Sequence, residues 1–205
     1  MRIKYLILVL LCTFSASAFV VSPVSWCISA QTVCKQLRKK VVTCDFFDTK
    51  TKQLLCKSIK RFKYIPGFTK TLENTITRTS VIKGSLYEIQ CAYTLAKQNP
   101  IKGFNQIKKG SGIHAQFDLI AFEGNKECWI ECKSIDWQKA WDNKKRRKGL
   151  QEQFLRQQTI VREHNQPIAQ HKTIYCVHSA TPITITWQEW FEKNNILFKE
   201  SFIMY

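Results

Sequence analysis

The sequence predicts an α/β protein with a mixed β-sheet flanked by helices, preceded by a small cysteine-bearing extension. Two runs of alternating apolar and polar residues, at 116–123 and 126–133, are separated by a Gly-Asn dipeptide, which is typical of a β-hairpin. Segments with helical periodicity lie on both sides of this hairpin, and a strand-like segment follows at 172–179. The expected order of core elements is therefore α-β-β-β-α-β, beginning at residue 85.

The first core helix is expected to begin at Ser85, a residue type suited to the N-cap, and to end before Asn99-Pro100. Its apolar residues recur at helical spacing on one face, formed by Leu86, Ile89, Tyr93 and Ala96. A strand is expected at 101–109, and a Gly-Ser-Gly loop separates it from the hairpin.

The second half of the core is expected to begin with a helix over 149–165, which ends before Pro167. One face of this helix is formed by Leu150, Phe154, Gln157 and Val161. The strand at 172–179 follows, and the sequence then indicates a further strand at 183–187 and a short helix at 187–194.

Residues 1–18 have the pattern of a cleaved secretory signal: a short basic start, an apolar run and a small-residue A-x-A site before Phe19. The apolar run is shorter than a membrane-spanning helix requires. We therefore expect an exported protein, periplasmic or secreted, with no stable membrane anchor after cleavage. Cleavage lowers the net charge from +17 by two, to 17 − 2 = +15.

Residues 19–70 are basic and are expected to form an irregular N-terminal subdomain, separated near the Pro66-Gly67 turn from a domain over 71–205. Export permits disulfides. Four cysteines of this segment are expected to form two of them: Cys27, Cys34, Cys44 and Cys56.

The Gly-Asn turn determines which residues of the two hairpin strands face each other. Counting outward from it, Asp118 lies opposite Glu131, with Cβ atoms about 5 Å apart. Lys133 lies opposite Gln116, one step along the same face. At this separation and an effective dielectric constant of about 20, two carboxylates repel each other by roughly 3 kcal/mol. The register therefore predicts a site in which another group neutralises the two acids.

A hard divalent cation offsets this repulsion best, and Mg²⁺ is commonly held by one or two carboxylates together with waters and substrate phosphates. We expect Mg²⁺, with Mn²⁺ as an alternative, to be bound by Asp118 and Glu131. Lys133 would polarise a water molecule and neutralise phosphate charge, which is the chemistry of metal-assisted phosphodiester hydrolysis. The alternative is a solvated face with three charges, but the strands look buried on both faces.

The segments "FD" at 117–118 and "IECK" at 130–133, joined by a hairpin, resemble the signature of the PD-(D/E)XK phosphodiesterase superfamily, although the proline is absent. The resemblance covers residues 84–180 and implies a restriction-endonuclease-like fold. In that family the aspartate and glutamate bind the metal and the lysine assists the nucleophilic water. The resemblance assigns these roles to Asp118, Glu131 and Lys133.

Many members also carry a glutamate on the first core helix, and "GSLYEIQCAYTLA" is similar to that helix, with Glu88 at the matching position. Some carry a glutamine on the helix after the lysine strand, where Gln153 or Gln157 would match. Glu88 is equally consistent with an acid favoured near a helix start, and the glutamines with ordinary exposed positions. His114 lies four residues before Asp118 and would approach the site from the preceding loop.

The chain carries 32 Lys and Arg against 15 Asp and Glu, which favours anionic partners, nucleic acid above all. One basic run is expected either to contact phosphates or to form a solvated loop: Lys144, Lys145, Arg146, Arg147 and Lys148.

These features predict an exported, Mg²⁺-dependent nuclease that hydrolyses phosphodiester bonds of DNA or RNA. Three alternatives stay open. In the first, the chain is a nuclease toxin with an immunity protein as partner. In the second, it is a non-catalytic nucleic-acid-binding protein that keeps the fold without a metal. In the third alternative, the basic N-terminus binds a membrane or a protein partner and the rest is a scaffold.

Overall fold

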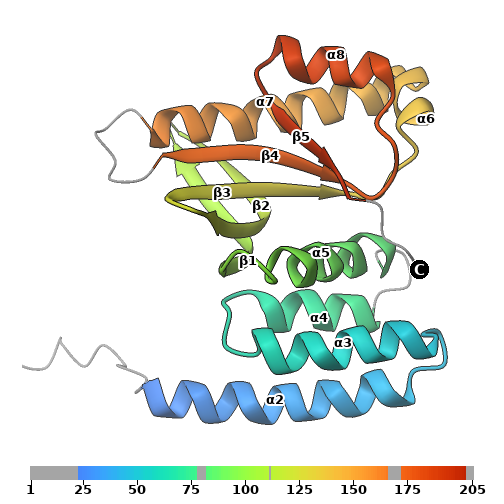
Figure 1. Cartoon of the computed structure of the whole chain (residues 1–205), viewed down its shortest axis with the longest axis vertical. Helices are drawn as coiled ribbons and strands as arrows, with labels where there is room; N and C mark the ends of the chain where they lie inside the picture. The colour runs from blue at the N-terminus through green and yellow to red at the C-terminus, as the bar shows by residue number, and fades with distance from the viewer. Residues whose placement is uncertain (1–22, 78–81, 111, 166–171, 202–205) are drawn as a thin grey trace, which may run out of the picture.

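The computed structural model describes residues 23–77, 82–110, 112–165 and 172–201, with side chains from residue 32 onward. The protein has three layers, with a β-sheet between two groups of helices (Figure 1). Four helices lie on one side of the sheet: α2 (Pro23–Thr43), α3 (Thr49–Phe62), α4 (Phe68–Thr77) and α5 (Ile82–Leu95). Three lie on the other: α6 (Trp137–Asp142), α7 (Lys144–His164) and α8 (Ile185–Lys193).

The sheet has five strands in the order β1-β2-β3-β4-β5. They are β1 (Ile101–Gly110), β2 (Ile113–Glu123), β3 (Lys126–Lys133), β4 (Thr173–Ser179) and β5 (Leu197–Glu200). The first three pair antiparallel, whereas β3, β4 and β5 pair parallel. The predicted order of core elements and the mixed sheet are confirmed, with the short helix α6 added before α7 and with α8 and β5 after β4.

Buried apolar side chains form two cores, one on each face of the sheet. Residues of α2–α5 pack with Leu119 and Ile130 on one face. Residues of α7 and α8 pack with Ile120 and Trp129 on the other. Both faces of the central strands are therefore covered, as expected for a sheet between helical layers.

The prediction of an irregular segment over 19–70 is wrong for its described part, which is largely helical. Helix α3 begins after Asp48, whose carboxylate accepts a hydrogen bond from the main-chain N–H of Thr51 at 2.7 Å. Leu55, Ile59 and Phe62 then recur at helical spacing and are buried. The cysteines and lysines between them obscured this periodicity.

The predicted boundary at residue 70 lies inside α4. The rings of Phe62 and Phe68 pack against Phe104 of β1, with centroids 5.5 and 5.3 Å apart. Phe104 is fully buried. The N-terminal helices and the sheet therefore share one core in this structure.

Of the four cysteines expected to form two disulfides, Cys34, Cys44 and Cys56 are free thiols in the structure. The side chain of Cys27 lies outside the described residues. Cys27 and Cys34 are both on α2, seven residues and therefore about 10.5 Å apart. A disulfide needs Cα atoms within about 7 Å, so these two cysteines do not pair within one straight helix.

Two further element boundaries differ from the prediction. Ser85 lies inside α5, which begins at Ile82, so it is not the N-cap. The strand expected at 183–187 is wrong: Thr184 is the N-cap of α8, and Trp187 is buried one turn into that helix. The apolar residues of 183–187 fit both the two-residue repeat of a strand and the spacing of a helix. Trp187 is buried against α6 and α7, and this packing favours the helix.

The predicted signal segment, 1–18, lies outside the described residues. Within the part of the chain that the structure describes, no helix combines the length and apolar character needed to cross a membrane.

We expect Phe104→Ala to lower the free energy of unfolding by about 3–5 kcal/mol, because it removes a buried ring shared by two layers. Ile107→Ala is the control in the same strand, since Ile107 is 63% exposed, and it should cost less than about 0.5 kcal/mol. Urea unfolding followed by circular dichroism and Trp fluorescence measures both. Separate unfolding of α2–α4 in the wild-type protein would contradict the shared core.

Candidate active site

The hairpin has the predicted register, from Glu123 opposite Lys126 to Leu119 opposite Ile130. Gly124 has φ of 60°, which the first position of a type II′ turn requires. The paired ladder ends at Leu119 and Ile130, so Asp118 and Glu131 are the next residues beyond it. The turn thus brings the two predicted acids to the open end of the hairpin.

The strands change their regular alternation at this end. Phe117 packs with Trp129 on the α7 side, at 4.9 Å between ring centroids, whereas Leu119 packs on the α2–α5 side. Asp118 lies between them and accepts a hydrogen bond from the main-chain N–H of Cys132 at 2.8 Å. The Asp118 carboxylate therefore occupies a position where a strand ladder would place a carbonyl, and it bridges β2 to β3.

Glu131 is only 3% exposed, and donors from two elements hold its carboxylate. Gln153 Nε2 donates to Oε1 at 2.8 Å, and Gln157 Nε2 donates to Oε2 at 2.6 Å. Lys133 Nζ contacts Oε1 as an ion pair. The two glutamines lie four residues apart on α7, so one helix face supplies both amides. The structure thus brings both predicted glutamines to Glu131.

Tyr175 of β4, which the sequence analysis did not single out, fixes the orientation of Gln157. Its hydroxyl donates to Gln157 Oε1 at 2.6 Å, while Gln157 Nε2 also donates to the carbonyl of Gln116 at 2.7 Å. With Oε1 taken by a donor, the amide presents Nε2 to Glu131. Tyr175 lies on a largely buried strand, and such a buried hydroxyl needs a partner.

Glu88 projects from α5 into the same region, where Asn105 Nδ2 donates to its Oε2 at 3.1 Å. Asn105 has a left-handed backbone, with φ of 50°, which asparagine tolerates better than most residues. Burial raises the pKa of Glu88 to about 7, the Asn105 hydrogen bond opposes this rise, and the charge of Glu131 adds to it.

Burial also raises the pKa of Asp118, and the charges of Glu131 and Glu88 raise it further. For Lys133, burial lowers the pKa, but the charges of Glu131 and Asp118 outweigh burial and the net direction is upward. Lys133 therefore stays protonated at neutral pH. The site thus combines three carboxyl groups with one lysine, and burial disfavours the charged forms of Asp118 and Glu88.

Asp118 and Glu131 are the residues that fit a divalent cation. Burial, and then the charges of Glu131 and Glu88, disfavour the charged form of Asp118, and a bound cation would offset these effects. Across the described ranges, no three His, Cys, Asp or Glu side chains converge as ligands of one metal ion. The chain would thus offer Mg²⁺ two carboxylates and leave the other positions to water and phosphate, which is usual for this ion.

A groove with a volume of about 300 Å³ lies between the β1–β2 hairpin and α7, and its wall includes the two glutamines that hold Glu131. Residues on its wall include Ile107, His114, Gln116, Gln153, Arg156 and Gln157. His114 is exposed on this wall, where it faces the groove. The groove therefore connects solvent to the two glutamines that hold Glu131.

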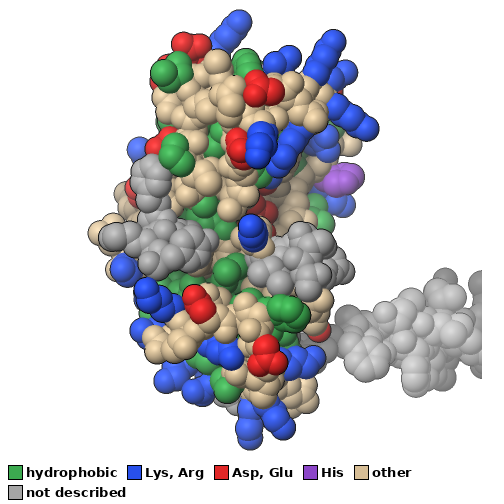
Figure 2. Space-filling view, turned by 90° about the vertical axis from the view of Figure 1, so that its right-hand side faces the viewer, with side chains coloured by type: hydrophobic (Ala, Val, Ile, Leu, Met, Phe, Trp, Pro, Cys, Tyr) green, Lys and Arg blue, Asp and Glu red, His purple; other side chains and the backbone are tan. Residues whose placement is uncertain are grey.

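The predicted basic run forms the first turns of α7 and is helical, not a loop. Asn143 caps the helix by accepting from the main-chain N–H of Arg146 at 2.9 Å. Arg147 donates to the Trp141 carbonyl at 3.0 Å and stacks on the Trp141 ring, so it is partly covered. The other four basic side chains of the run are exposed. Lys and Arg side chains gather at this end of the molecule and again over α2–α4 (Figure 2).

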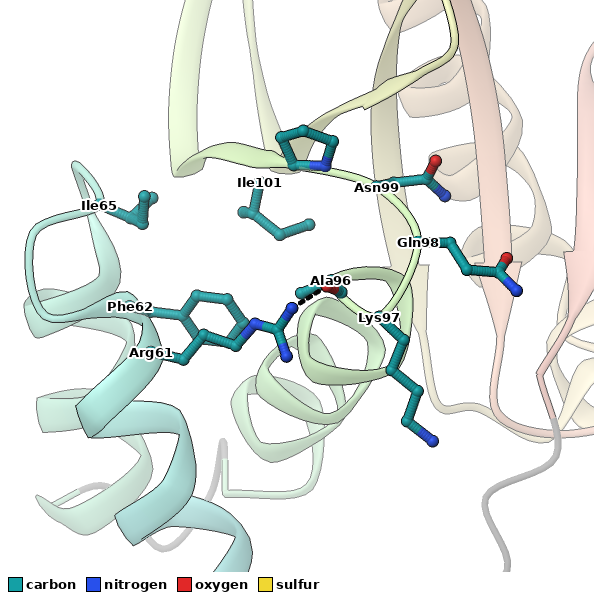
Figure 3. Close-up of a pocket in the computed structure, with 9 residues that line it drawn as sticks. Arg61, Phe62, Ile65, Ala96, Lys97, Gln98, Asn99 and Ile101 are labelled. Atoms are coloured by element: carbon teal, nitrogen blue, oxygen red, sulfur yellow. Dashed lines mark hydrogen bonds between the residues drawn. The ribbon is translucent and has the colours of Figure 1, made fainter.

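A second cavity, of about 350 Å³, lies where the ends of α3 and α5 meet the start of β1 (Figure 3). Arg61 donates to the main-chain carbonyl of Ala96 there. The side chains of Lys97, Gln98 and Asn99 point away from the cavity in Figure 3. This cavity therefore lacks the converging polar groups of the acidic site.

No family model matches the chain, and no curated protein matches it. Among solved structures, protein VC1899 from Vibrio cholerae is similar at 12% sequence identity and a TM-score of 0.31. The match covers 85% of this chain and 48% of that protein, so the chain spans about half the length of its structural neighbour. At this TM-score the similarity carries no inference about function.

Glu88→Gln tests the burial of charge in the site. Because the pKa of Glu88 is raised in the folded protein, folding takes up a proton, and the free energy of unfolding falls as pH rises from about 4.5 through about 7. The glutamine should raise the free energy of unfolding at pH 8 by up to roughly 3 kcal/mol and change it little at pH 4. Urea titrations at both pH values measure this difference.

The control for Glu88→Gln is Glu73→Gln, an exposed glutamate on the neighbouring helix α4. Equal effects of the two changes at pH 8 would contradict the buried position of Glu88. Asp118 has a raised pKa as well, so some pH dependence should remain in the Glu88→Gln protein.

Tyr175→Phe should lower the free energy of unfolding by about 1–3 kcal/mol, because it leaves the buried Gln157 Oε1 without its donor. It should also shift and broaden the side-chain amide signal of Gln157 in an NMR spectrum, since the amide loses its fixed orientation. Tyr93→Phe, on α5 and outside this network, is the matched control. An unchanged Gln157 signal would show that Tyr175 does not orient the amide.

Proposed function

We propose that the protein is an exported, metal-dependent nuclease that hydrolyses phosphodiester bonds of DNA or RNA. The observation that carries the proposal is the meeting of Asp118, Glu131 and Lys133 at the open end of one hairpin. Two of these are nearly enclosed acids, and the third is a lysine that forms an ion pair with Glu131. Such a set of buried, mutually perturbed charges is more typical of a reaction site than of a structural ion pair.

The arrangement of elements supports a restriction-endonuclease-like core for this proposal. The helix α5, the strands β1 to β3, the helix α7 and the strand β4 follow each other in the order implied by the PD-(D/E)XK resemblance. The acids lie on β2 and β3, and the glutamines lie on the helix that follows, as that resemblance implies.

The residues divide the work of hydrolysis between them. Asp118 and Glu131 would hold Mg²⁺ or Mn²⁺, which when bound lowers the pKa of water and neutralises phosphate charge. Gln153 and Gln157 keep the Glu131 carboxylate in one orientation, so the site needs little rearrangement on binding.

Lys133 supplies a protonated ammonium group beside the acids. Its raised pKa keeps it charged, so it can donate a hydrogen bond to a water molecule or to a phosphate oxygen. A fixed cation in a largely enclosed site stabilises the negative charge that develops on a phosphodiester during attack. Lys133 is thus the group of this chain that would act directly on the reacting atoms.

The proposal is tested by incubating the protein with plasmid DNA, single-stranded DNA and RNA in Mg²⁺, Mn²⁺ or EDTA. We expect cleavage that requires a metal ion. Asp118→Asn, Glu131→Gln and Lys133→Ala should each lower the rate by at least about 100-fold. Glu123→Gln is the control, because Glu123 is an exposed carboxylate at the other end of β2, where it pairs with Lys199.

Cleavage by all three variants at the wild-type rate would show that the site is elsewhere. Binding of nucleic acid without cleavage under every metal condition would replace the nuclease with a non-catalytic binding protein.

A further inference from the structure

Two residues on the wall of the groove hold Glu131, so the groove is a route by which a substrate can approach this acid. Glu131 is 3% exposed and Asp118 is 9% exposed, so neither offers a carboxylate to a flat surface. Gln153 and Gln157 line the groove and donate directly to Glu131. A substrate that approaches from this side must therefore enter the groove, where only the side chains of Gln153 and Gln157 separate it from Glu131.

The size of the groove discriminates between forms of nucleic acid. Its volume of about 300 Å³ is at the lower end for small-molecule pockets, which hold roughly 300–1,000 Å³. A group the size of a nucleotide fits such a space. A B-form duplex, whose bases are paired and stacked inside the helix, does not fit a space of this volume. A paired strand would first have to be unstacked and extruded.

Helix α7 carries a continuous track for a strand that leads to the groove. Arg146, Gly149, Gln153 and Arg156 are spaced by three, four and three residues, so they share one helix face. Arg146 and Arg156 are exposed and lie about 15 Å apart along the axis. Gly149 leaves open space between them, because a Cβ there would meet no atom within 4 Å.

The lining of the groove suits a polyanion with exposed bases. Arg156 supplies a positive charge, and the residues that line the groove, all in the described part of the chain, include no carboxylate. Ile107 is 63% exposed on the opposite wall, where it offers apolar contact to an unstacked base. Positive charge along a backbone track combined with apolar contact for bases is how single strands are bound without sequence preference.

We propose that the substrate is single-stranded nucleic acid, whose backbone follows α7 from Arg146 to Arg156 and brings one phosphodiester into the groove next to Gln153 and Gln157, the two partners of Glu131. This inference rests on the proposed nuclease function. It assigns the substrate form and names Arg156 as a residue that binds the backbone.

The cleavage test uses one labelled sequence in three forms: single strand, blunt duplex and duplex with a single-stranded overhang, each with Mg²⁺. We expect cleavage of the single strand and of the overhang, with cuts ending near the junction and at least tenfold slower cleavage of the blunt duplex. Equal cleavage of duplex and single strand, or cuts throughout the paired region, would overturn the inference and leave the nuclease function standing. Cleavage of no form would overturn the nuclease function, and the binding test then decides whether a single strand follows α7.

The binding test uses the labelled single strand in EDTA, followed by fluorescence anisotropy over a range of salt. Arg156→Gln should weaken binding and make the slope of log affinity against log salt less steep by about 0.7, the value for one single-strand phosphate contact. Arg162→Gln is the matched control, because Arg162 lies on the same helix but turns away to the carbonyl of Asn194. Equal effects of the two variants would overturn the role of Arg156.

Gly149→Leu gives a second variant that keeps the helix, since leucine forms helices better than glycine. A leucine side chain would stand in the open space of the track. We expect it to weaken binding of the single strand by at least fivefold. Unchanged binding would exclude this face of α7 as the backbone track. Binding that depends on Arg156 and Gly149 without hydrolysis would overturn only the nuclease function.

Discussion

Glu131 is a carboxylate that the fold encloses almost completely, and the rest of the site follows from the need to pair it. An ionised carboxylate removed from water without partners costs several kcal/mol. Here the donors come from Gln153 and Gln157 on α7 and from Lys133 on the same strand. Helix α7 therefore has to lie over β3 in one rotational setting, with those two amides facing the sheet. Tyr175 extends the requirement to β4, because its hydroxyl orients Gln157.

The enclosed charge also explains the irregular geometry of the hairpin end. A regular ladder would leave Asp118 facing Glu131 on one surface. Instead Asp118 turns to the main-chain N–H of Cys132, which gives one of its oxygens a donor. Glu88 is paired in the same way by Asn105, whose left-handed backbone allows its amide to reach α5. A cation bound beside Asp118 and Glu88 would favour their charged forms, which burial disfavours.

The parts of this site that depend on local spacing could be predicted from the sequence. A two-residue turn fixes a hairpin register, so the pairing from Glu123–Lys126 to Leu119–Ile130 could be predicted without a structure. The turn of Asp118 toward the main chain of Cys132, beyond that ladder, could not. A four-residue spacing on a helix placed Gln153 and Gln157 on one face. Tyr175 could not be found in this way, because its partner is 18 residues away and their contact depends on the parallel pairing of β3 with β4. The helices α2–α4 were missed because lysines and cysteines interrupt their apolar spacing.

The N-terminal helices are part of the site's support and not an appendage to it. Asn105 Nδ2 donates to Thr71 of α4 at 2.7 Å as well as to Glu88, and its Oδ1 accepts from Gln116. This one side chain therefore links α4, α5 and β2 next to the acids.

Phe104, the neighbour of Asn105 in β1, is buried among rings of α3 and α4 and fixes the same segment from the apolar side. Because Asn105 has to hold an unfavourable backbone angle, it depends on these contacts to stay in place. The position of Glu88 relative to Asp118 thus depends on residues before position 72, which is why a division of the chain near residue 70 would separate the site from the helices that set its geometry.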